Sequence, residues 1–516
     1  MGFIMDKDLT EQSIPIGEKL ISNTFYLFLD WFALSIIGFF FWFASGKLLL
    51  PEAYGIVSTS VNLALLLGGA SLLGLHLASW KLIAGYTVRK KNKKIVALTR
   101  FSLKFVIISN LVVLAMLFSL SPFLLTILKI PLSVLLLSGA ILFSYSIATH
   151  FRYIIYGFQD MKKLMITDVM GQLSKLLVSI ILTLLGFKFL GPLIGFLFGQ
   201  VLIILSRIGS IPLKGTGGYI DKKYVMFNYA LPGFIVGIGF LVFTNGQYVL
   251  LTALRTPEVT GLYTVAMLLT SFLVFVPTTL NSALLPITSQ LSVERNAQIR
   301  QRKLIQLIIR YSLLMTLPLA ILLLMFSKIA ILLFSRVEYL SASSFFPVLI
   351  IGSVVYGIGG IFLDNIYAIG RPKVTRNIVI LMTLTFLALS FPLIHFLSAL
   401  GSALAYTISA ILMTLMSFWY LRKTIHMSLP YYSIIKLLIS IIISFGLFYL
   451  LMNLVQNIVF RLVLAFLSSL LYLIILVPLK FYTKDDMKIL DFLERRIPFL
   501  NKQIVKLRDA MTKYAV

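Results

Sequence analysis

The chain alternates long apolar runs with short polar connections. Most runs hold about 20 or more residues, the length that a helix needs to cross a hydrocarbon core of about 30 Å. Continuous apolar runs of this length predict membrane-spanning helices rather than half-buried strands. We therefore expect an all-α polytopic membrane protein with about fourteen transmembrane helices, at residues 24–45, 53–80, 99–121, 131–156, 164–187, 190–209, 224–250, 258–288, 305–334, 344–369, 375–396, 399–420, 432–452 and 458–480.

A short motif recurs at the start of two of these runs. The segment LLPEAYGIV around Pro51 reappears as RTPEVTGLY around Pro257, 206 positions further on. A second pair, IIYGFQDMK (154–162) and NIYAIGRPK (365–373), is separated by 211 positions. Duplicated halves that face each other across a central cavity are a common design of secondary transporters. The repeat predicts two pseudo-symmetric six-helix lobes and two extra C-terminal helices.

The spans and the repeat together predict the domain organisation. The run at 305–334 is the least regular, because Pro318 interrupts it, and a bend there would invert the topology downstream. Beyond the last span, Thr483 and Asp486 are spaced to cap an amphipathic helix, which we expect on the membrane surface. The predicted parts are an N-lobe at 1–209, a cytoplasmic linker at 210–223, a C-lobe at 224–421, two further spans within 422–480 and a cytoplasmic amphipathic tail at 481–516.

The charges predict the orientation of these spans. The chain is 59% hydrophobic and 12% charged, with a formal net charge of +27. With a cytoplasmic N-terminus, the clustered Lys and Arg residues fall in the inner loops and the outer connections hold only isolated cations. This asymmetry predicts a cell-membrane protein with both termini in the cytoplasm. The positive charge then faces anionic membrane lipids, and no nucleic acid partner is needed.

Sequence motifs for catalysis and metal binding are missing. The absence of cysteine excludes disulfides, thiolate metal sites and thiol chemistry. There is no Gly-x-x-x-x-Gly-Lys phosphate loop and no His-Glu-x-x-His. A membrane glycosyltransferase or polymerase is the main enzymatic alternative, but the outer connections are short and poor in carboxylates. We expect no enzyme, no catalytic residues, no cofactor and no metal site.

The predicted fifth span carries a polar stripe. Asp168, Gln172, Lys175 and Ser179 follow the i, i+4, i+7, i+11 spacing of one helix face. A charge within the membrane is costly and normally faces a cavity or a partner. One interpretation is a cavity wall on which Lys175 and Gln172 bind an anionic headgroup. The alternative is a structural ion pair of Lys175 with Asp168 or Asp30.

Two intramembrane carboxylates are candidates for ion coupling. Asp30 lies about a third of the way into the first predicted span, and Asp168 lies on the polar stripe. Burial makes a carboxylate responsive to its surroundings, so such groups can couple transport to H⁺ or Na⁺. The alternative for Asp30 is a salt bridge to a basic residue of the second or fifth span. Lys81, in the second span, is a further headgroup candidate, although it can also extend to the interface.

Opposite charges occupy neighbouring positions of the repeat. Under the separation of 211, Arg152 corresponds to Leu363, and Asp364 corresponds to Tyr153. We therefore expect Arg152 and Asp364 to form an inner gate when the two halves meet. Arg152 is also a candidate ligand for an anionic headgroup.

At this point the residues support a family resemblance. The N-terminal segment with its turn LPEAYG (50–55), the later LGL (73–75), the segment IYAIGRPKVTRN (366–377) and the tail TKDDMKILDFLERRIP resemble polysaccharide-export flippases. These Wzx-like proteins belong to the multidrug/oligosaccharidyl-lipid/polysaccharide (MOP) exporter superfamily. The likeness extends over nearly the whole chain as a diffuse pattern without a catalytic motif.

The resemblance implies a function and its partners. It implies alternating access that carries a lipid-linked oligosaccharide, on a polyprenyl phosphate or pyrophosphate, from the cytoplasmic to the outer leaflet. An ion gradient or the membrane potential would drive the movement, and we expect a monomer. Within the superfamily, a lipid II flippase and an ion-coupled multidrug exporter of the MATE type remain alternatives.

Overall fold

The computed structural model describes residues 13–291, 297–452, 455 and 457–482, and these residues form helices joined by short connections. Thirteen of the described helices are long and apolar enough to cross a membrane, and a shorter apolar helix covers Val459–Ile475. The chain is therefore a multi-pass, all-helical membrane protein, as its apolar runs predict. The predicted tail helix lies outside the described residues.

The chain divides into two compact units, each built from several stretches of sequence. Unit 1 comprises Met1–Ser271, Lys328–Gly352 and Lys373–Met413. Unit 2 comprises Phe272–Ser327, Ser353–Pro372 and Thr414–Val516. The domain boundaries expected from the repeat stay a prediction.

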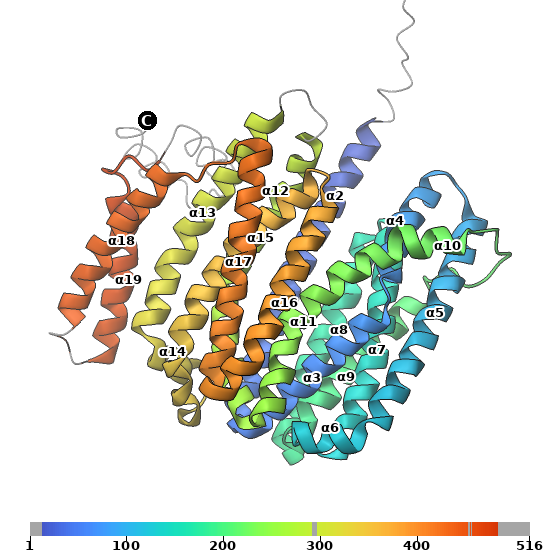
Figure 1. The fold of residues 1–516 in the computed structure, drawn as a ribbon, viewed down its shortest axis with the longest axis horizontal. Helices are drawn as coiled ribbons and strands as arrows, with labels where there is room; N and C mark the ends of the chain where they lie inside the picture. Colours follow the sequence, from blue (N-terminus) through green and yellow to red (C-terminus); the bar gives the residue numbers. More distant parts are fainter. Residues whose placement is uncertain (1–12, 292–296, 453–454, 456, 483–516) are drawn as a thin grey trace, which may run out of the picture. The chain divides into compact units, whose positions relative to one another are not determined.

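Unit 1 holds most of the helices (Figure 1). Three long helices, α12 (Pro257–Leu291), α15 (Phe346–Ala368) and α17 (Ala399–Ile425), contribute residues to both units. The elements that lie wholly or almost wholly in unit 1 are α2 (Ser13–Leu48), α3 (Pro51–Ser71), α4 (Leu75–Val88), α5 (Asn92–Ser119), α6 (Ser121–Leu128), α7 (Leu132–Phe158), α8 (Met161–Leu182), η1 (Thr183–Phe187), α9 (Leu190–Ile208), α10 (Lys222–Val225), η2 (Met226–Ala230), α11 (Leu231–Leu254), α14 (Ser327–Phe334), η3 (Val337–Ser344) and α16 (Pro372–Leu397).

Unit 2 contains α13 (Ala297–Met325), α18 (Tyr431–Met452) and α19 (Ile458–Ile475). Helices α18 and α19 pack against each other and against α13. The hydroxyl of Ser440 donates to the carbonyl oxygen of Tyr472 at 2.6 Å, which ties α18 to α19 within the apolar interior. These two helices are the extra C-terminal pair that the sequence predicts.

Two predicted spans differ in the structure. The second one breaks at Leu73 and Gly74, whose φ angles are 49° and 72°, so α3 and α4 are separate helices. Glycine tolerates this left-handed conformation because it lacks a Cβ atom. The run at 305–334 divides near its end: α13 continues through Pro318 to Met325, and a short α14 follows it.

The repeated Pro-Glu-x-x-Gly motifs lie against each other in unit 1. A Cβ atom built on Gly55 would lie 1.6 Å from the carbonyl oxygen of Pro257. The reciprocal Cβ atom on Gly261 would lie 1.9 Å from the carbonyl oxygen of Pro51. Any side chain at either position would overlap the backbone of the other motif. The motif therefore requires glycine because α3 and α12 cross here at backbone distance.

The same crossing brings further equivalent positions together. The hydroxyl of Thr264 on α12 donates to the hydroxyl oxygen of Ser58 on α3 at 2.8 Å, and these residues are 206 positions apart in the sequence. Gly55 and Gly261 have the same separation. A local two-fold relationship brings equivalent residues of the two repeats into contact. The first repeat of the sequence therefore corresponds to a symmetric contact in the fold.

Candidate functional site

Four helices of unit 1 bring the candidate charges together. Helix α8 begins at Asp160, whose side chain accepts a hydrogen bond from the backbone N–H of Lys163 and so caps the helix. It packs against both α2 and α9, and α7 packs against α9 (Figure 1). The polar face of α8 therefore meets polar residues of three neighbouring helices.

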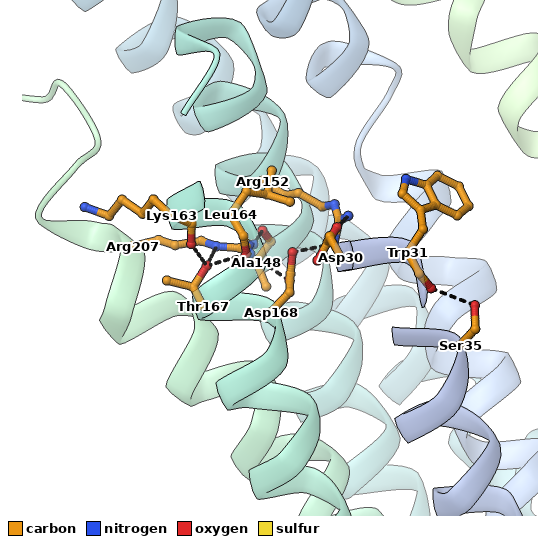
Figure 2. A network of polar contacts seen from close by, with 10 residues as sticks. All are labelled: Asp30, Trp31, Ser35, Ala148, Arg152, Lys163, Leu164, Thr167, Asp168 and Arg207. Carbon is orange, nitrogen blue, oxygen red and sulfur yellow. Dashed lines mark hydrogen bonds and ion pairs between the residues drawn. The ribbon is translucent and has the colours of Figure 1, made fainter. Parts of the chain in front are cut away.

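Arg152 on α7 lies at the centre of the resulting ion-pair network (Figure 2). One guanidinium nitrogen, Nη2, donates to Asp30 Oδ2 of α2 at 2.5 Å, and the other, Nη1, donates to Asp168 Oδ2 of α8 at 2.5 Å. The side chain of Arg152 is 19% exposed, whereas those of Asp30 and Asp168 are 0% and 5% exposed. Of these three groups, Arg152 is the most accessible to solvent or a ligand.

Arg207 completes the network from the last turn of α9. Its Nη2 lies 2.7 Å from Asp168 Oδ1, and its Nε donates to Thr167 Oγ1 at 2.9 Å. Two backbone carbonyl oxygens, of Ala148 and Leu164, accept the remaining hydrogen bonds at 3.3 and 3.4 Å. The side chain is only 1% exposed. Arg207 is thus a buried cation that holds Asp168 in place.

The network is formally neutral, with two carboxylates and two guanidinium groups. A buried charge without a partner is costly in a membrane, and here every charge has at least one. Asp30 and Asp168 accept from two of the five N–H groups of Arg152, so an anionic ligand can bind a remaining N–H group or take the place of one carboxylate. Loss of charge on either carboxylate favours that exchange, because fewer negative groups then hold the guanidinium.

A cavity of about 490 Å³ opens beside this network. Aromatic rings, amide groups and the more accessible side of the network line it. All lining residues belong to unit 1: Trp31, Leu34, Trp80, Tyr145, Ala148, Thr149, Arg152, Tyr153, Tyr156, Asp168, Gln172, Gln200, Ile203 and Arg207. Of the predicted headgroup ligands, Arg152 and Gln172 are therefore at a cavity wall.

Lys175 occupies a different environment on the same helix. Its Nζ lies 4.7 Å from the ring centroid of Phe41 and 5.1 Å from that of Phe196. It is 6% exposed and does not line the cavity. The alternative prediction of an ion pair with Asp168 or Asp30 is wrong, because both carboxylates bind arginines and no described carboxylate pairs with Lys175. The cation rests on aromatic faces instead.

Asp30 forms a salt bridge, but the partner is not in the second or fifth predicted span as the alternative expected. Asp30 is bound by Arg152 of α7, which is the fourth predicted span. Arg152 reaches it because α2 packs on α8, directly beside the end of the Arg152 side chain.

Two other predicted residues have separate surroundings. Lys81 on α4 is exposed, and its Nζ lies 5.2 Å from the ring centroid of Tyr229. Asp364 in unit 2 accepts a hydrogen bond from Asn281 Nδ2 at 2.8 Å. The inner gate of Arg152 and Asp364 joins residues of different units and stays a prediction.

A family model for polysaccharide biosynthesis proteins matches residues 20–292, more than half of the chain. The chain belongs to the polysaccharide biosynthesis protein family. The matched region contains every residue of the charged network and the cavity lining. A comparison of the sequence with curated proteins finds no match.

Solved structures of MOP transporters have the same fold as this polysaccharide biosynthesis protein. The lipid II flippase MurJ, in an inward closed conformation, is similar with a TM-score of 0.67 and 19% identity, over 88% of this chain and 98% of MurJ. An inward-facing multidrug resistance MATE transporter of the MOP superfamily is similar with a TM-score of 0.63 and 15% identity, over 78% of this chain and 94% of the transporter. At these identities the likeness concerns the fold.

Arg207 was not identified from the sequence as part of the charged network. Arg207 lies at the end of the sixth predicted run (190–209), and the positive-inside pattern groups it with the cations of the following cytoplasmic loop; in the structure it lies inside α9 and is buried. A signal was present, because Gln200, Ile203 and Arg207 are spaced at i, i+3 and i+7 and therefore share a helix face. All three line the cavity.

Proposed function

We propose that this polysaccharide biosynthesis protein is a flippase that carries a lipid-linked oligosaccharide from the cytoplasmic to the outer leaflet by alternating access. The substrate would be an oligosaccharide on a polyprenyl phosphate or pyrophosphate. The observation that carries the proposal is Arg152, an intramembrane guanidinium that borders a 490 Å³ cavity and is partly accessible. Guanidinium groups bind phosphate oxygens in a bidentate manner, which suits the headgroup of such a lipid.

The paired carboxylates suggest how an ion would drive this movement. Asp30 and Asp168 compete with the phosphate for the same guanidinium. Binding of H⁺ or Na⁺ at either carboxylate would weaken its hold on Arg152 and favour the anionic headgroup. Release of the ion would restore the internal ion pairs and expel the headgroup. Asp30 and Asp168 are thus proposed coupling residues, with Gln172 beside them as a neutral headgroup contact.

The network gives less support to the other predicted headgroup ligands. Lys175 lies between phenyl rings and Lys81 lies over Tyr229, and neither lines the cavity. We therefore assign the phosphate to Arg152 and expect Lys175 to act in packing.

A liposome assay tests the proposed flippase. The purified chain is reconstituted with a fluorescent polyprenyl-pyrophosphate oligosaccharide, and an enzyme added outside the vesicles reports its arrival in the outer leaflet. We expect movement under an imposed H⁺ or Na⁺ gradient with wild type and its loss with Arg152→Gln, while Lys175→Met keeps most of it. No movement with wild type, together with saturable uptake of an organic cation, would favour a MATE-type exporter instead.

The proposed direction depends on cytoplasmic termini, and the absence of cysteine makes this easy to test. Thr216 lies in the predicted inner linker and Thr126 in a predicted outer connection, and both are exposed. In intact cells, a membrane-impermeant maleimide should label Thr126→Cys and spare Thr216→Cys. The reverse labelling pattern would invert the orientation and with it the direction of transport.

A further inference from the structure

We infer that the cavity contains a sugar subsite, formed by the rings of Trp80, Tyr153 and Tyr156 next to the phosphate-binding Arg152. This inference rests on the proposed flippase function and specifies its substrate: the hexose attached directly to the phosphate stacks on these rings. The three rings adjoin one another at the cavity, with their planes tilted by 36° to 62°. The ring centroids of Trp80 and Tyr156 are 5.6 Å apart, those of Tyr153 and Tyr156 5.8 Å, and those of Trp80 and Tyr153 6.0 Å.

The backbone brings these rings together at one close contact. Trp80 is on α4, while Tyr153 and Tyr156 are on consecutive turns of α7. A Cβ atom on Gly157 would lie 2.8 Å from Ile83 Cβ and 3.2 Å from the carbonyl oxygen of Trp80. Glycine at this position lets α7 approach α4 at Trp80. The three rings therefore lie on a packed scaffold rather than on a loop.

The three rings, called the platform below, lie next to the charged network. The guanidinium carbon of Arg152 lies 5.7 Å from the ring centroid of Tyr156. All four of these side chains line the same cavity. A ligand whose phosphate binds Arg152 would therefore carry its next chemical group onto the rings.

The chemistry of the surface favours a sugar over other ligands. The C–H bonds on one face of a pyranose carry partial positive charge and contact the negative face of an aromatic ring. Sugar hydroxyls need polar partners, and Gln172 supplies one: its Oε1 is buried and has no hydrogen-bond partner among the described residues. Gln172 lines the cavity together with Gln200 and Thr149. These three side chains would offer donors and acceptors to the hydroxyls of the bound sugar.

An organic cation fits the same rings less well. Aromatic surfaces also attract quaternary ammonium groups, usually with help from a free carboxylate. Here Asp30 and Asp168 are bound by arginines, and the network adds no net negative charge. The guanidinium of Arg152 over one face of Tyr156 puts a positive charge beside the rings, which disfavours a second cation. The surface therefore favours a neutral, hydroxylated ring.

Paired probes test the sugar subsite. The full chain in nanodiscs is titrated with two probes that share one short polyprenyl pyrophosphate, of which one carries a single hexose and the other has no sugar. We expect wild type to bind the hexose probe more tightly. Trp80→Leu and Tyr153→Leu should each weaken the hexose probe by about two- to tenfold and leave the bare probe unchanged. Tyr153→Phe keeps the ring and should keep the preference.

Matched variants separate this inference from the proposed function. Trp419→Leu, at an exposed tryptophan of α17 outside the cavity, should change neither affinity. If wild type binds both probes and the platform variants weaken both equally or neither, the sugar subsite is overturned and the flippase stands. If wild type binds neither probe, both proposals fail. Tighter binding of tetraethylammonium than of the hexose probe would also overturn the sugar subsite.

Discussion

Arg152 and Lys175 are two intramembrane cations of the same unit, and the protein accommodates them in opposite ways. Arg152 receives two carboxylates and remains partly accessible at a cavity. Lys175 is buried against the rings of Phe41 and Phe196 and pairs with no described carboxylate. Asp168 and Lys175 stand only seven positions apart on α8. A polar position within the membrane therefore does not by itself mark a binding site.

The difference lies in what each cation can exchange. The guanidinium of Arg152 can trade a carboxylate for a phosphate oxygen, because both are oxygen acceptors of similar geometry. The ammonium of Lys175 lies over the rings of Phe41 and Phe196, and aromatic faces offer a weaker attraction. We expect Arg152 to matter for both stability and transport, and Lys175 for neither to the same degree.

The largest expected effect follows from removing Arg152. In Arg152→Met, the buried Asp30 loses its partner and Asp168 keeps only Arg207. Leaving a buried charge unpaired typically costs about 3–5 kcal/mol of unfolding free energy. Denaturant titration in mixed micelles measures this loss, and the liposome assay should show no flipping. A variant as stable as wild type would contradict the central role of the network.

A smaller effect is expected from the carboxylates, and it should differ between them. Asp168 bonds two arginines, whereas Asp30 bonds only Arg152. Asp168→Asn should therefore lower the unfolding free energy by about 2 kcal/mol, because a fully buried Arg207 loses its counterion, and Asp30→Asn should lower it by less. The same titration compares the two variants. Equal losses would show that Arg207 does not depend on Asp168.

The aromatic contacts of Lys175 predict a measurable coupling. Phe41→Leu should cost more stability in wild type than in a Lys175→Leu background, because a leucine has neither a charge nor a sulfur atom that the ring face attracts. The expected coupling is about 0.5–2 kcal/mol, as for other buried cation–π pairs. A double-mutant cycle in the same titration gives this value. Zero coupling would mean that Phe41 and Lys175 are neighbours without a cation–π interaction.

The smallest effect is expected from Lys175→Met alone. Methionine is close to lysine in length and apolar, so it fills the space between the rings without a buried charge. Replacing buried charges by apolar groups of similar volume is often neutral or stabilising. We expect an unfolding midpoint at or above that of wild type, measured by thermal unfolding, and flipping close to wild type. Loss of flipping equal to that of Arg152→Met would make Lys175 part of the transport site.

Much of the fold follows from the sequence, for a simple reason. A helix that crosses a membrane must satisfy its own backbone hydrogen bonds and present apolar side chains, so each span leaves a long apolar run. The break between α3 and α4 was missed, because the run stays apolar across the turn at Leu73 and Gly74. The run through Pro318 was predicted as a single span despite the proline, and α13 continues through that residue.

The candidate site was only partly predictable. The spacing of Asp168 and Gln172 on one face of α8 follows from helix geometry, and both line the cavity. Helix geometry also placed Lys175 on that polar stripe. In the structure, α2 and α9 pack over this turn of α8 and bury Lys175. From the sequence, Arg207 was assigned to a loop. A cation at the end of an apolar run gives the same sequence pattern whether it is buried between helices or exposed in a loop.

The sequence by itself determined that this protein spans the membrane many times, that it contains a repeated motif and that a few charges lie within its helices. Those properties depend on the length, period and composition of local segments. Only the tertiary structure decided that Asp30 and Asp168 bind Arg152, that Gly55 meets Gly261 and that Lys175 faces rings. These pairings join residues on different helices, and the rotation and contact of helices depend on side chains along their whole length.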